Sequence, residues 1–227
     1  IAGFGGQGVL SMGKILAYSG LMEGKEVSWM PAYGPEQRGG TANVTVIVSD
    51  DKISSPILSK YDTAIILNQP SLEKFESRVK PGGILIYDGY GIINPPTRKD
   101  IKVYRIDAMD AANEMNNAKA FNMIVLGGLL QLRPIVTLEN VIKGLKKTLP
   151  ERHHHLIPMN EEAIKKGMEL IVNCQLSIVI FSCIFASNYE TNLTIIYIIL
   201  RCRTECYPCA TQPCPPANRR ERTRPIW

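Results

Sequence analysis

The sequence predicts a doubly wound α/β fold, with a mixed but mostly parallel sheet that carries helices on both faces. Short apolar segments alternate along the chain with longer segments of helical periodicity, which is the order that βαβ units produce. Several of the short segments are apolar at every position, as strands of a parallel sheet are when helices cover both sides. These two observations place the chain in this class.

A glycine-rich turn follows the first expected strand. Ile1–Leu10 reads as the end of a buried strand, a tight turn and the first turn of a helix, as in a Rossmann-like fold. Gly3, Gly5 and Gly8 satisfy the pattern G-x-G-x-x-G, and Gly6 adds another glycine. Glycines permit positive φ and let an anion approach the N–H groups at the helix N-terminus. The motif alone does not prove a nucleotide site, and a purely structural turn is the alternative.

Five further strands are expected, each of them apolar or rich in β-branched residues: Glu26–Met30, Thr41–Val48, Asp62–Leu67, Gly83–Asp88 and Lys102–Ile106. Pro31 is expected to end the second strand. The strand at 41–48 follows the second strand without a helix between them. We therefore expect an antiparallel or hairpin-related pairing there, which makes the sheet mixed.

The expected helices have apolar residues at helical spacing and are Val9–Glu23, Pro70–Val79, Asp107–Asn116, Phe121–Leu132, Leu138–Leu149 and Glu161–Ile171. The helix at 121–132 is apolar nearly all round, so it is expected in the core or in a subunit contact. Asn160 is expected to cap the last helix, and Pro150 and Pro158 indicate a loop before it.

The C-terminal part of the chain differs in composition from the rest. All six cysteines lie after position 173, and the last Lys is Lys166. We therefore expect a domain at 1–172 and an atypical tail at 173–227, which is either a non-native extension or a flexible appendage. Leu176–Ala186 and Leu193–Leu200 are expected to form a β-hairpin in this tail. The cysteine spacing around Cys202–Cys214 matches no standard metal pattern, and an ordered metal site is the alternative.

Charge and hydropathy bound the location and the partners. A net charge of +5 over 227 residues does not indicate nucleic-acid binding. No apolar run reaches the length of a membrane span, and the body of the chain lacks cysteine. We therefore expect a cytoplasmic protein without a signal peptide. A few residues of the first strand are expected to precede Ile1.

The glycine loop lacks the usual companion of a nicotinamide cofactor. A classical NAD site places an acidic residue at the end of the second strand, about 20 residues past the glycines. Glu26 stands at the start of that strand, and the strand is expected to end at Pro31 and Ala32. This counts against NAD, and the absence of G-K-[ST] after the loop excludes a Walker-type site.

A second glycine-rich loop, Tyr33–Gly40, is expected at the same edge of the sheet. Its Arg38 can bind a phosphate or carboxylate in a bidentate manner, although a solvated loop arginine is the alternative.

Five stretches of the chain carry a family resemblance: Gly3–Val9, Tyr33–Gly40, Val48–Asp50, Asn122–Gly128 and Leu149–Arg152. With these stretches the chain resembles the gamma subunit of 2-oxoacid:ferredoxin oxidoreductases. The resemblance covers roughly residues 1–171. The 2-oxoglutarate type looks nearest, and pyruvate, ketoisovalerate and indolepyruvate relatives share these elements.

The resemblance implies one subunit of a larger enzyme. That enzyme oxidatively decarboxylates a 2-oxoacid, transfers the acyl group to coenzyme A and reduces ferredoxin. Thiamine diphosphate and Mg²⁺ are held by the alpha and beta subunits, and iron–sulfur clusters by beta and a ferredoxin-like subunit. The implied partners are these subunits and ferredoxin, with a homodimer possible for the isolated chain. This chain is expected to hold no metal, no cluster and no catalytic residue.

The resemblance also implies which residues contact coenzyme A. They come from the two loops and from the entry to the apolar helix, and are Gly5, Gly6, Gln7, Gly8, Gln37, Arg38, Lys119 and Asn122. Two other interpretations stay open at this point, an independent NAD(P)-dependent oxidoreductase and a non-catalytic module that binds a nucleotide or acyl-CoA. The run His153–His155 is interpreted as structural or surface histidines rather than as metal ligands.

Overall fold

The computed structural model describes residues 1–34 and 39–186, with side-chain surroundings up to residue 171. The chain divides into two compact units, Ile1–Leu176 and Ser177–Trp227. The elements below belong to the first unit, apart from the C-terminal part of the last helix. The boundary that the sequence places between residues 172 and 173 stays a prediction.

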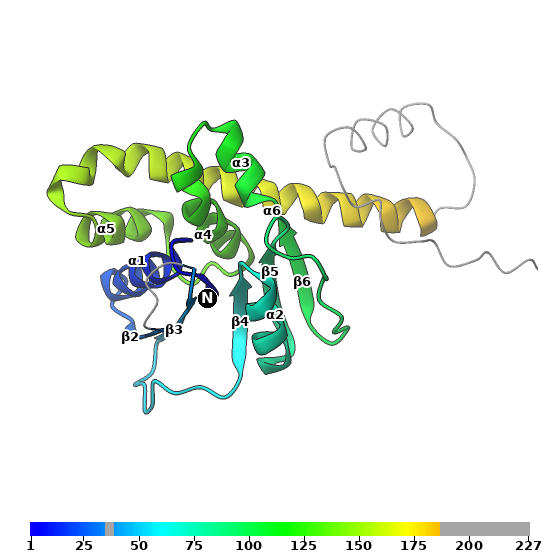
Figure 1. Ribbon diagram of the computed structural model, residues 1–227, viewed down its shortest axis with the longest axis horizontal. Helices are drawn as coiled ribbons and strands as arrows, with labels where there is room; N and C mark the ends of the chain where they lie inside the picture. Colours follow the sequence, from blue (N-terminus) through cyan, green and yellow to red (C-terminus); the bar gives the residue numbers. More distant parts are fainter. Residues whose placement is uncertain (35–38, 187–227) are drawn as a thin grey trace, which may run out of the picture. The chain divides into compact units, whose positions relative to one another are not determined.

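Six strands of the described residues form one mixed sheet, in the order β2-β3-β1-β4-β5-β6 (Figure 1). They are β1 (Ala2–Phe4), β2 (Glu26–Tyr33), β3 (Thr41–Ser49), β4 (Tyr61–Ile66), β5 (Val79–Asp88) and β6 (Lys102–Ile106). β1, β4, β5 and β6 pair in parallel, whereas β3 pairs antiparallel with both β2 and β1. The predicted mixed sheet and the antiparallel pairing of β3 are confirmed.

The helices of the first unit cover both faces of this sheet, as predicted. They are α1 (Val9–Met22), α2 (Gln69–Phe75), α3 (Ala108–Glu114), α4 (Phe121–Leu132), α5 (Leu138–Thr148) and α6 (Ile157–Ala186), with 3₁₀ turns η1 (Glu76–Arg78), η2 (Ala118–Ala120) and η3 (Glu151–Leu156). Ile65 and Ile86 lie in the larger core cluster, to which α1 and α3–α6 contribute. Ala64 and Leu85 alternate with them along β4 and β5 and lie in a smaller cluster with α2.

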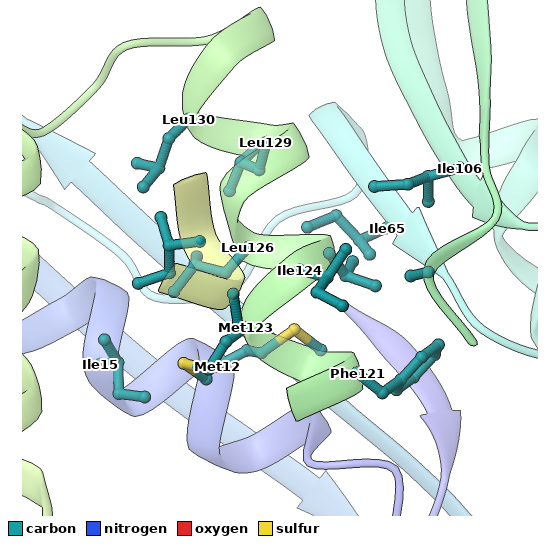
Figure 2. Close-up of a cluster of buried hydrophobic side chains, with 14 of the residues drawn as sticks. Met12, Ile15, Ile65, Ile106, Phe121, Met123, Ile124, Leu126, Leu129 and Leu130 are labelled. Atoms are coloured by element: carbon teal, nitrogen blue, oxygen red, sulfur yellow. The ribbon is translucent and has the colours of Figure 1, made fainter. Parts of the chain in front are cut away.

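The apolar helix α4 lies at the centre of the larger core cluster. Figure 2 shows Met123, Ile124 and Leu126 between Met12 of α1 and Ile65 of β4. Of the two sites expected for this helix, core and subunit contact, the structure shows burial in the core of the chain itself. This burial explains why apolar residues occupy nearly every face of the helix.

Glycine allows α4 and α6 to approach each other backbone to backbone. A Cβ atom on Gly127 of α4 would overlap the carbonyl oxygen of Ile164 in α6. A Cβ atom on Gly167 of α6 would in turn overlap the carbonyl oxygen of Ile124 in α4. Because both obstacles are backbone atoms, no side-chain rotation can relieve the overlap.

Pro31 does not end β2, contrary to the prediction, and the strand continues to Tyr33. Pro31 stands opposite Val44, whose N–H donates to the carbonyl of Ile1 on its other side at 2.8 Å. The Pro31–Val44 pair is therefore the non-hydrogen-bonded kind, and the proline nitrogen points to the open edge of the sheet. An edge strand tolerates proline in this position.

The predicted end of the helix at 70–79 is also wrong. α2 stops at Phe75, a 3₁₀ turn follows, and Val79 begins β5. The guanidinium of Arg98 explains this ending, because its Nη1 donates to the carbonyl oxygens of Glu76 and Val79 at 2.8 and 2.7 Å. The guanidinium thus holds the 3₁₀ turn, in which the N–H of Val79 also donates to the carbonyl of Glu76, and the chain then enters β5.

The start and end of the last helix differ from the prediction as well. α6 begins at Ile157 with Pro158 in its first turn, where proline is well tolerated. Asn160 therefore lies inside the helix, and its side-chain nitrogen donates to the carbonyl of Leu156 at 2.9 Å. At its other end α6 contains Leu176–Ala186, which the sequence predicted as a strand. The second predicted strand, Leu193–Leu200, lies outside the described residues.

Candidate functional site

The glycine loop between β1 and α1 lies at the carboxyl edge of the parallel strands. Gly6 has φ of 104° and Gly8 has φ of 77°, backbone conformations that residues with a Cβ atom rarely adopt. The N–H of Gly5 donates to the carbonyl of Gly40 at 2.9 Å. The first loop therefore contacts the end of the second glycine-rich loop. Within that second loop, Gln37 and Arg38 lie outside the described residues.

Gln7 braces the loop from inside. Its Oε1 accepts a hydrogen bond from the N–H of Phe4 at 2.6 Å, and its Nε2 donates to the carbonyl of Leu67 at 3.2 Å. The side chain thus joins the carboxyl ends of β1 and β4. Since both ends of the amide are engaged by the protein, Gln7 fits a role in holding the loop in shape better than a role as a direct ligand contact.

The entry to α4 packs against the same loop. A Cβ atom on Gly8 would lie 2.9 Å from the Cβ of Asn122, which is closer than real Cβ contacts allow. Asn122 therefore lies against the loop, and its contact with coenzyme A stays a prediction. Lys119 is exposed in η2, one turn before Asn122. Its ammonium can supply positive charge at this end of α4.

The N-terminus of α1 offers N–H groups without side-chain competition. Gly8 is the N-cap in the left-handed conformation, and within the described first turn of α1 there is neither a side-chain cap nor an acidic residue. The first N–H groups of a helix have no partner within the helix and carry a partial positive charge. Such an end favours an anion with several oxygens, such as a phosphate.

The structure places Glu26 away from this loop. Because β2 is parallel to β1, its first residue lies at the opposite edge of the sheet. Glu26 is therefore not in position to bind a ribose held by the glycine loop, and this geometry disfavours the NAD interpretation.

Asp88 is a buried carboxylate that sequence reasoning missed. It ends β5, is 1% exposed, and accepts hydrogen bonds from the N–H groups of Ala108 at 3.1 Å and Tyr90 at 3.2 Å. Burial raises its pKa from 3.8 to about 6, against the lowering effect of the backbone N–H groups. Its signal in the sequence was an acidic residue at the carboxyl end of a buried apolar strand.

Replacing Asp88 by asparagine is expected to change how stability depends on pH. A carboxyl whose pKa is raised by folding holds its proton more tightly in the folded state. The free energy of unfolding therefore falls as the pH rises from about 4 to about 6. The fall attributable to Asp88 is on the order of 3 kcal/mol. Urea unfolding at pH 4, 5 and 6.5 measures this fall. In the asparagine variant the free energy of unfolding should no longer show the part of its pH dependence that comes from Asp88. Equal slopes in the two proteins would contradict the assignment.

Asn68 is a second polar residue that the sequence did not single out. It follows β4, is 1% exposed, and its Oδ1 accepts from the N–H of Ser71 at 2.9 Å. It is therefore the N-cap of α2. An asparagine two residues before Pro70, at the expected start of a helix, was the signal that could have identified it.

The histidine run lies in η3 rather than in the predicted loop. The Nε2 of His154 contacts the carbonyl oxygens of Lys146 at 3.1 Å and Leu149 at 3.0 Å, at the C-terminus of α5. Among the side chains that the structure describes, residues 1–34 and 39–171, no group of three or more His, Cys, Asp or Glu is placed to hold a metal ion. The tail cysteines at 202–214 lie outside these ranges. Among the helices that the structure describes, none has the length and apolar character needed to cross a membrane.

Comparison with known proteins shows which family and which relatives the chain resembles. Residues 1–170 match the family described as pyruvate ferredoxin/flavodoxin oxidoreductase. Ketoisovalerate oxidoreductase subunit VorA of Methanothermobacter thermautotrophicus is 37% identical over 169 residues, covering 74% of this chain and 35% of VorA. The chain thus spans about a third of the length of that curated relative.

Two solved structures share the fold. The gamma subunit of a keto/oxoacid ferredoxin oxidoreductase from Geobacter sulfurreducens superimposes with a TM-score of 0.63 at 27% identity, over 75% of this chain and 95% of that one. A 2-oxoglutarate:ferredoxin oxidoreductase from Magnetococcus marinus, solved with 2-oxoglutarate, coenzyme A and succinyl-CoA, gives 0.68 at 27% identity, over 75% of this chain and 30% of that one. The chain therefore belongs to the pyruvate ferredoxin/flavodoxin oxidoreductase family and matches the gamma subunit of its 2-oxoacid:ferredoxin oxidoreductases.

Proposed function

We propose that the chain binds the phosphates of coenzyme A and helps to assemble a 2-oxoacid:ferredoxin oxidoreductase. The observation that supports this most is that α1 begins at the carboxyl edge of the sheet, directly after Gly6 and Gly8, without a side chain that caps its first N–H groups. Coenzyme A carries several phosphate charges, which this end of the helix would stabilise. The coenzyme A in the Magnetococcus marinus enzyme is consistent with this ligand class.

The candidate residues have different roles in this proposal. Gly5, Gly6 and Gly8 present the backbone, and Gln7 holds it in shape through Phe4 and Leu67. Asn122 and Lys119 supply polar and positive groups from the entry to α4. Gln37 and Arg38 are proposed to contact the phosphates from the second loop, whose Gly40 is hydrogen-bonded to Gly5.

The chemistry of the reaction belongs to other subunits in this proposal. Thiamine diphosphate, Mg²⁺ and iron–sulfur clusters are assigned to alpha, beta and ferredoxin-like partners, and the electrons leave to ferredoxin in the cytoplasm. We propose 2-oxoglutarate as the 2-oxoacid. The relatives bear on this choice in both directions, since the Magnetococcus marinus enzyme is named for 2-oxoglutarate and VorA for ketoisovalerate.

Replacing Arg38 by alanine in the assembled complex is expected to raise the KM for coenzyme A by roughly ten- to a hundredfold. Loss of one charge-assisted, bidentate phosphate contact is worth about 1.5–3 kcal/mol. The KM for the 2-oxoacid should stay within about twofold, because that substrate binds elsewhere. Steady-state kinetics with ferredoxin reduction as readout measures both constants.

The matched control is Arg38→Lys, which keeps the charge but not the planar fork. It should give an intermediate KM for coenzyme A. If Arg38→Ala leaves the KM for coenzyme A unchanged, the role assigned to Arg38 is wrong.

A further inference from the structure

Tyr33 is an exposed tyrosine at the carboxyl edge of the sheet. It is the last residue of β2 and is 67% exposed. Its backbone pairs with β3 opposite Ala42, and the N–H of the following Gly34 donates to the carbonyl of Thr41 at 3.4 Å. The sheet itself therefore carries the ring, and a tyrosine held in this way loses little side-chain freedom when it makes a contact.

The strand register defines the face of the sheet on which the ring lies. Tyr33 stands opposite Ala42, which belongs to the larger core cluster together with Val9 of α1. Residues opposite each other in a β-pair share a face, so Tyr33 lies on the face against which α1 packs (Figure 1). Trp29 has the same face by alternation, and a Cβ atom on Gly13 of α1 would lie 3.3 Å from its Nε1.

The same register sets the level of the ring along α1. Ala42 also stands opposite Gly3, so Tyr33, Ala42 and Gly3 form one row across three strands. On this face Gly3 meets the start of α1, because a Cβ atom there would lie 3.2 Å from Cγ2 of Val9 and 2.6 Å from Oε1 of Gln7. Tyr33 is therefore level with the glycine loop and the first turn of α1, and it lies roughly 10 Å from Gly3 across two strand spacings.

The other exposed aromatic side chains of the described residues do not share this position. They are Phe4, Trp29 and Tyr90. Phe4 alternates with Ala2 of the smaller core cluster, so it lies on the opposite face of the sheet. Trp29 covers the middle of α1, and Tyr90 follows β5, which β4 separates from β1. Tyr33 is therefore the exposed ring of these residues that lies beside the N-terminus of α1.

We propose that Tyr33 is a platform on which the adenine of coenzyme A stacks. This inference rests on the proposed function, because it starts from phosphates bound at the N-terminus of α1. In coenzyme A the ribose joins the adenine to the diphosphate, so the base lies close to the phosphates. With the diphosphate at the first N–H groups of α1, the base reaches a ring that lies roughly 10 Å from Gly3.

Stacking on Tyr33 gives the site a means of recognising the nucleotide half of its ligand. The N–H groups at the glycine loop attract any phosphate, whereas an aromatic face favours a flat base. A ligand with a phosphate but no base would use only the first of these contacts. The platform therefore favours coenzyme A over 4′-phosphopantetheine, which lacks the adenosine part.

The test replaces Tyr33 by leucine and measures the affinity of the assembled complex for both ligands by isothermal titration. The affinity for coenzyme A is expected to fall roughly tenfold, within the range for loss of one base–aromatic stack. The affinity for 4′-phosphopantetheine should stay within about twofold, because that ligand has no base to stack.

Two control variants separate the ring from other effects. Tyr33→Phe keeps the aromatic face and should bind coenzyme A within about twofold of the parent complex. Tyr90→Leu removes another exposed tyrosine at the end of a strand and should leave both affinities unchanged. Size-exclusion chromatography and the melting temperature establish that each variant is folded and assembled.

Four outcomes would overturn the proposal. An unchanged affinity of Tyr33→Leu for coenzyme A would mean that the base does not contact the ring. An equal loss for both ligands would mean that the ring supports the phosphate site instead of the base. A Tyr33→Phe variant as weak as Tyr33→Leu would assign the contact to the hydroxyl group. Loss of assembly in Tyr33→Leu would assign the ring to a contact with a partner subunit.

Failure of this inference is distinguishable from failure of the proposed function. If coenzyme A slows amide exchange at residues 6–11 while Tyr33→Leu keeps full affinity, only the stacking is wrong. If coenzyme A gives no protection at residues 6–11 in the parent complex, the phosphate site itself is wrong.

Discussion

Replacing Gly127 by alanine is expected to lower the free energy of unfolding by about 3 kcal/mol, the upper part of the range for an overpacked core. The added Cβ would overlap the carbonyl oxygen of Ile164, and α4 and α6 would have to separate to make room. Separation would disturb the centre of the core, where Ile124 and Leu126 are fully buried (Figure 2). The gain of about 1 kcal/mol from the better helix propensity of alanine is too small to compensate.

The matched substitution is Gly34→Ala, because a Cβ there would meet no atom of the described residues within 4 Å. It should change stability by less than about 0.5 kcal/mol. Gly167→Ala should behave like Gly127→Ala, since the contact with Ile124 is the reciprocal one. Urea unfolding followed by circular dichroism compares all three variants. A Gly127→Ala variant as stable as the parent chain would contradict the close approach of the two helices.

Replacing Ser11 by aspartate is expected to weaken the binding of coenzyme A by roughly tenfold while leaving the fold intact. Ser11 is exposed in the first turn of α1, which has no acidic residue. A carboxylate there would interact favourably with the helix dipole and stabilise the chain by about 0.3–1 kcal/mol. The same carboxylate would repel a bound phosphate by about 1–3 kcal/mol at a separation of roughly 5 Å. Stability and ligand affinity should therefore change in opposite directions.

The isosteric control for this prediction is Ser11→Asn, which has the shape of aspartate without its charge. It should keep the affinity for coenzyme A within about threefold, and raising the salt concentration should reduce the defect of the aspartate variant only. The affinity is measured by isothermal titration of the assembled complex. Equal affinities for the aspartate and asparagine variants would mean that no phosphate lies at this end of α1.

Local sequence patterns were sufficient to predict most of the elements. β6 and α4 begin and end at the residues that their sequence patterns predicted, and in α4 nearly every residue of the apolar run is buried. The errors arose where distant contacts decide the local structure. Arg98 ends the helix before Val79 through contacts with carbonyls that lie 22 and 19 residues earlier in the chain. Pro31 is accommodated only because its strand lies at the edge of the sheet, and strand order is not a local property.

The candidate site was predictable in part for the same reason. The glycine pattern located the loop, and the resemblance brought in Asn122, which the structure places against Gly8. Neither indicated that the amide of Gln7 is used to join β1 to β4, since that contact depends on the position of Leu67. Asp88 was missed because its importance comes from burial at a strand end, which only the packed structure defines.

Hydrogen exchange on the assembled complex, with and without saturating coenzyme A, tests the central claim most directly. If phosphates bind at the glycine loop, the amides of Gly6, Gly8 and the first turn of α1 at residues 9–11 should exchange at least tenfold more slowly with the ligand present. The core amides of α4 should be unaffected and serve as the internal reference. Unchanged exchange at residues 6–11, together with protection elsewhere in the complex, would show that coenzyme A binds without this loop.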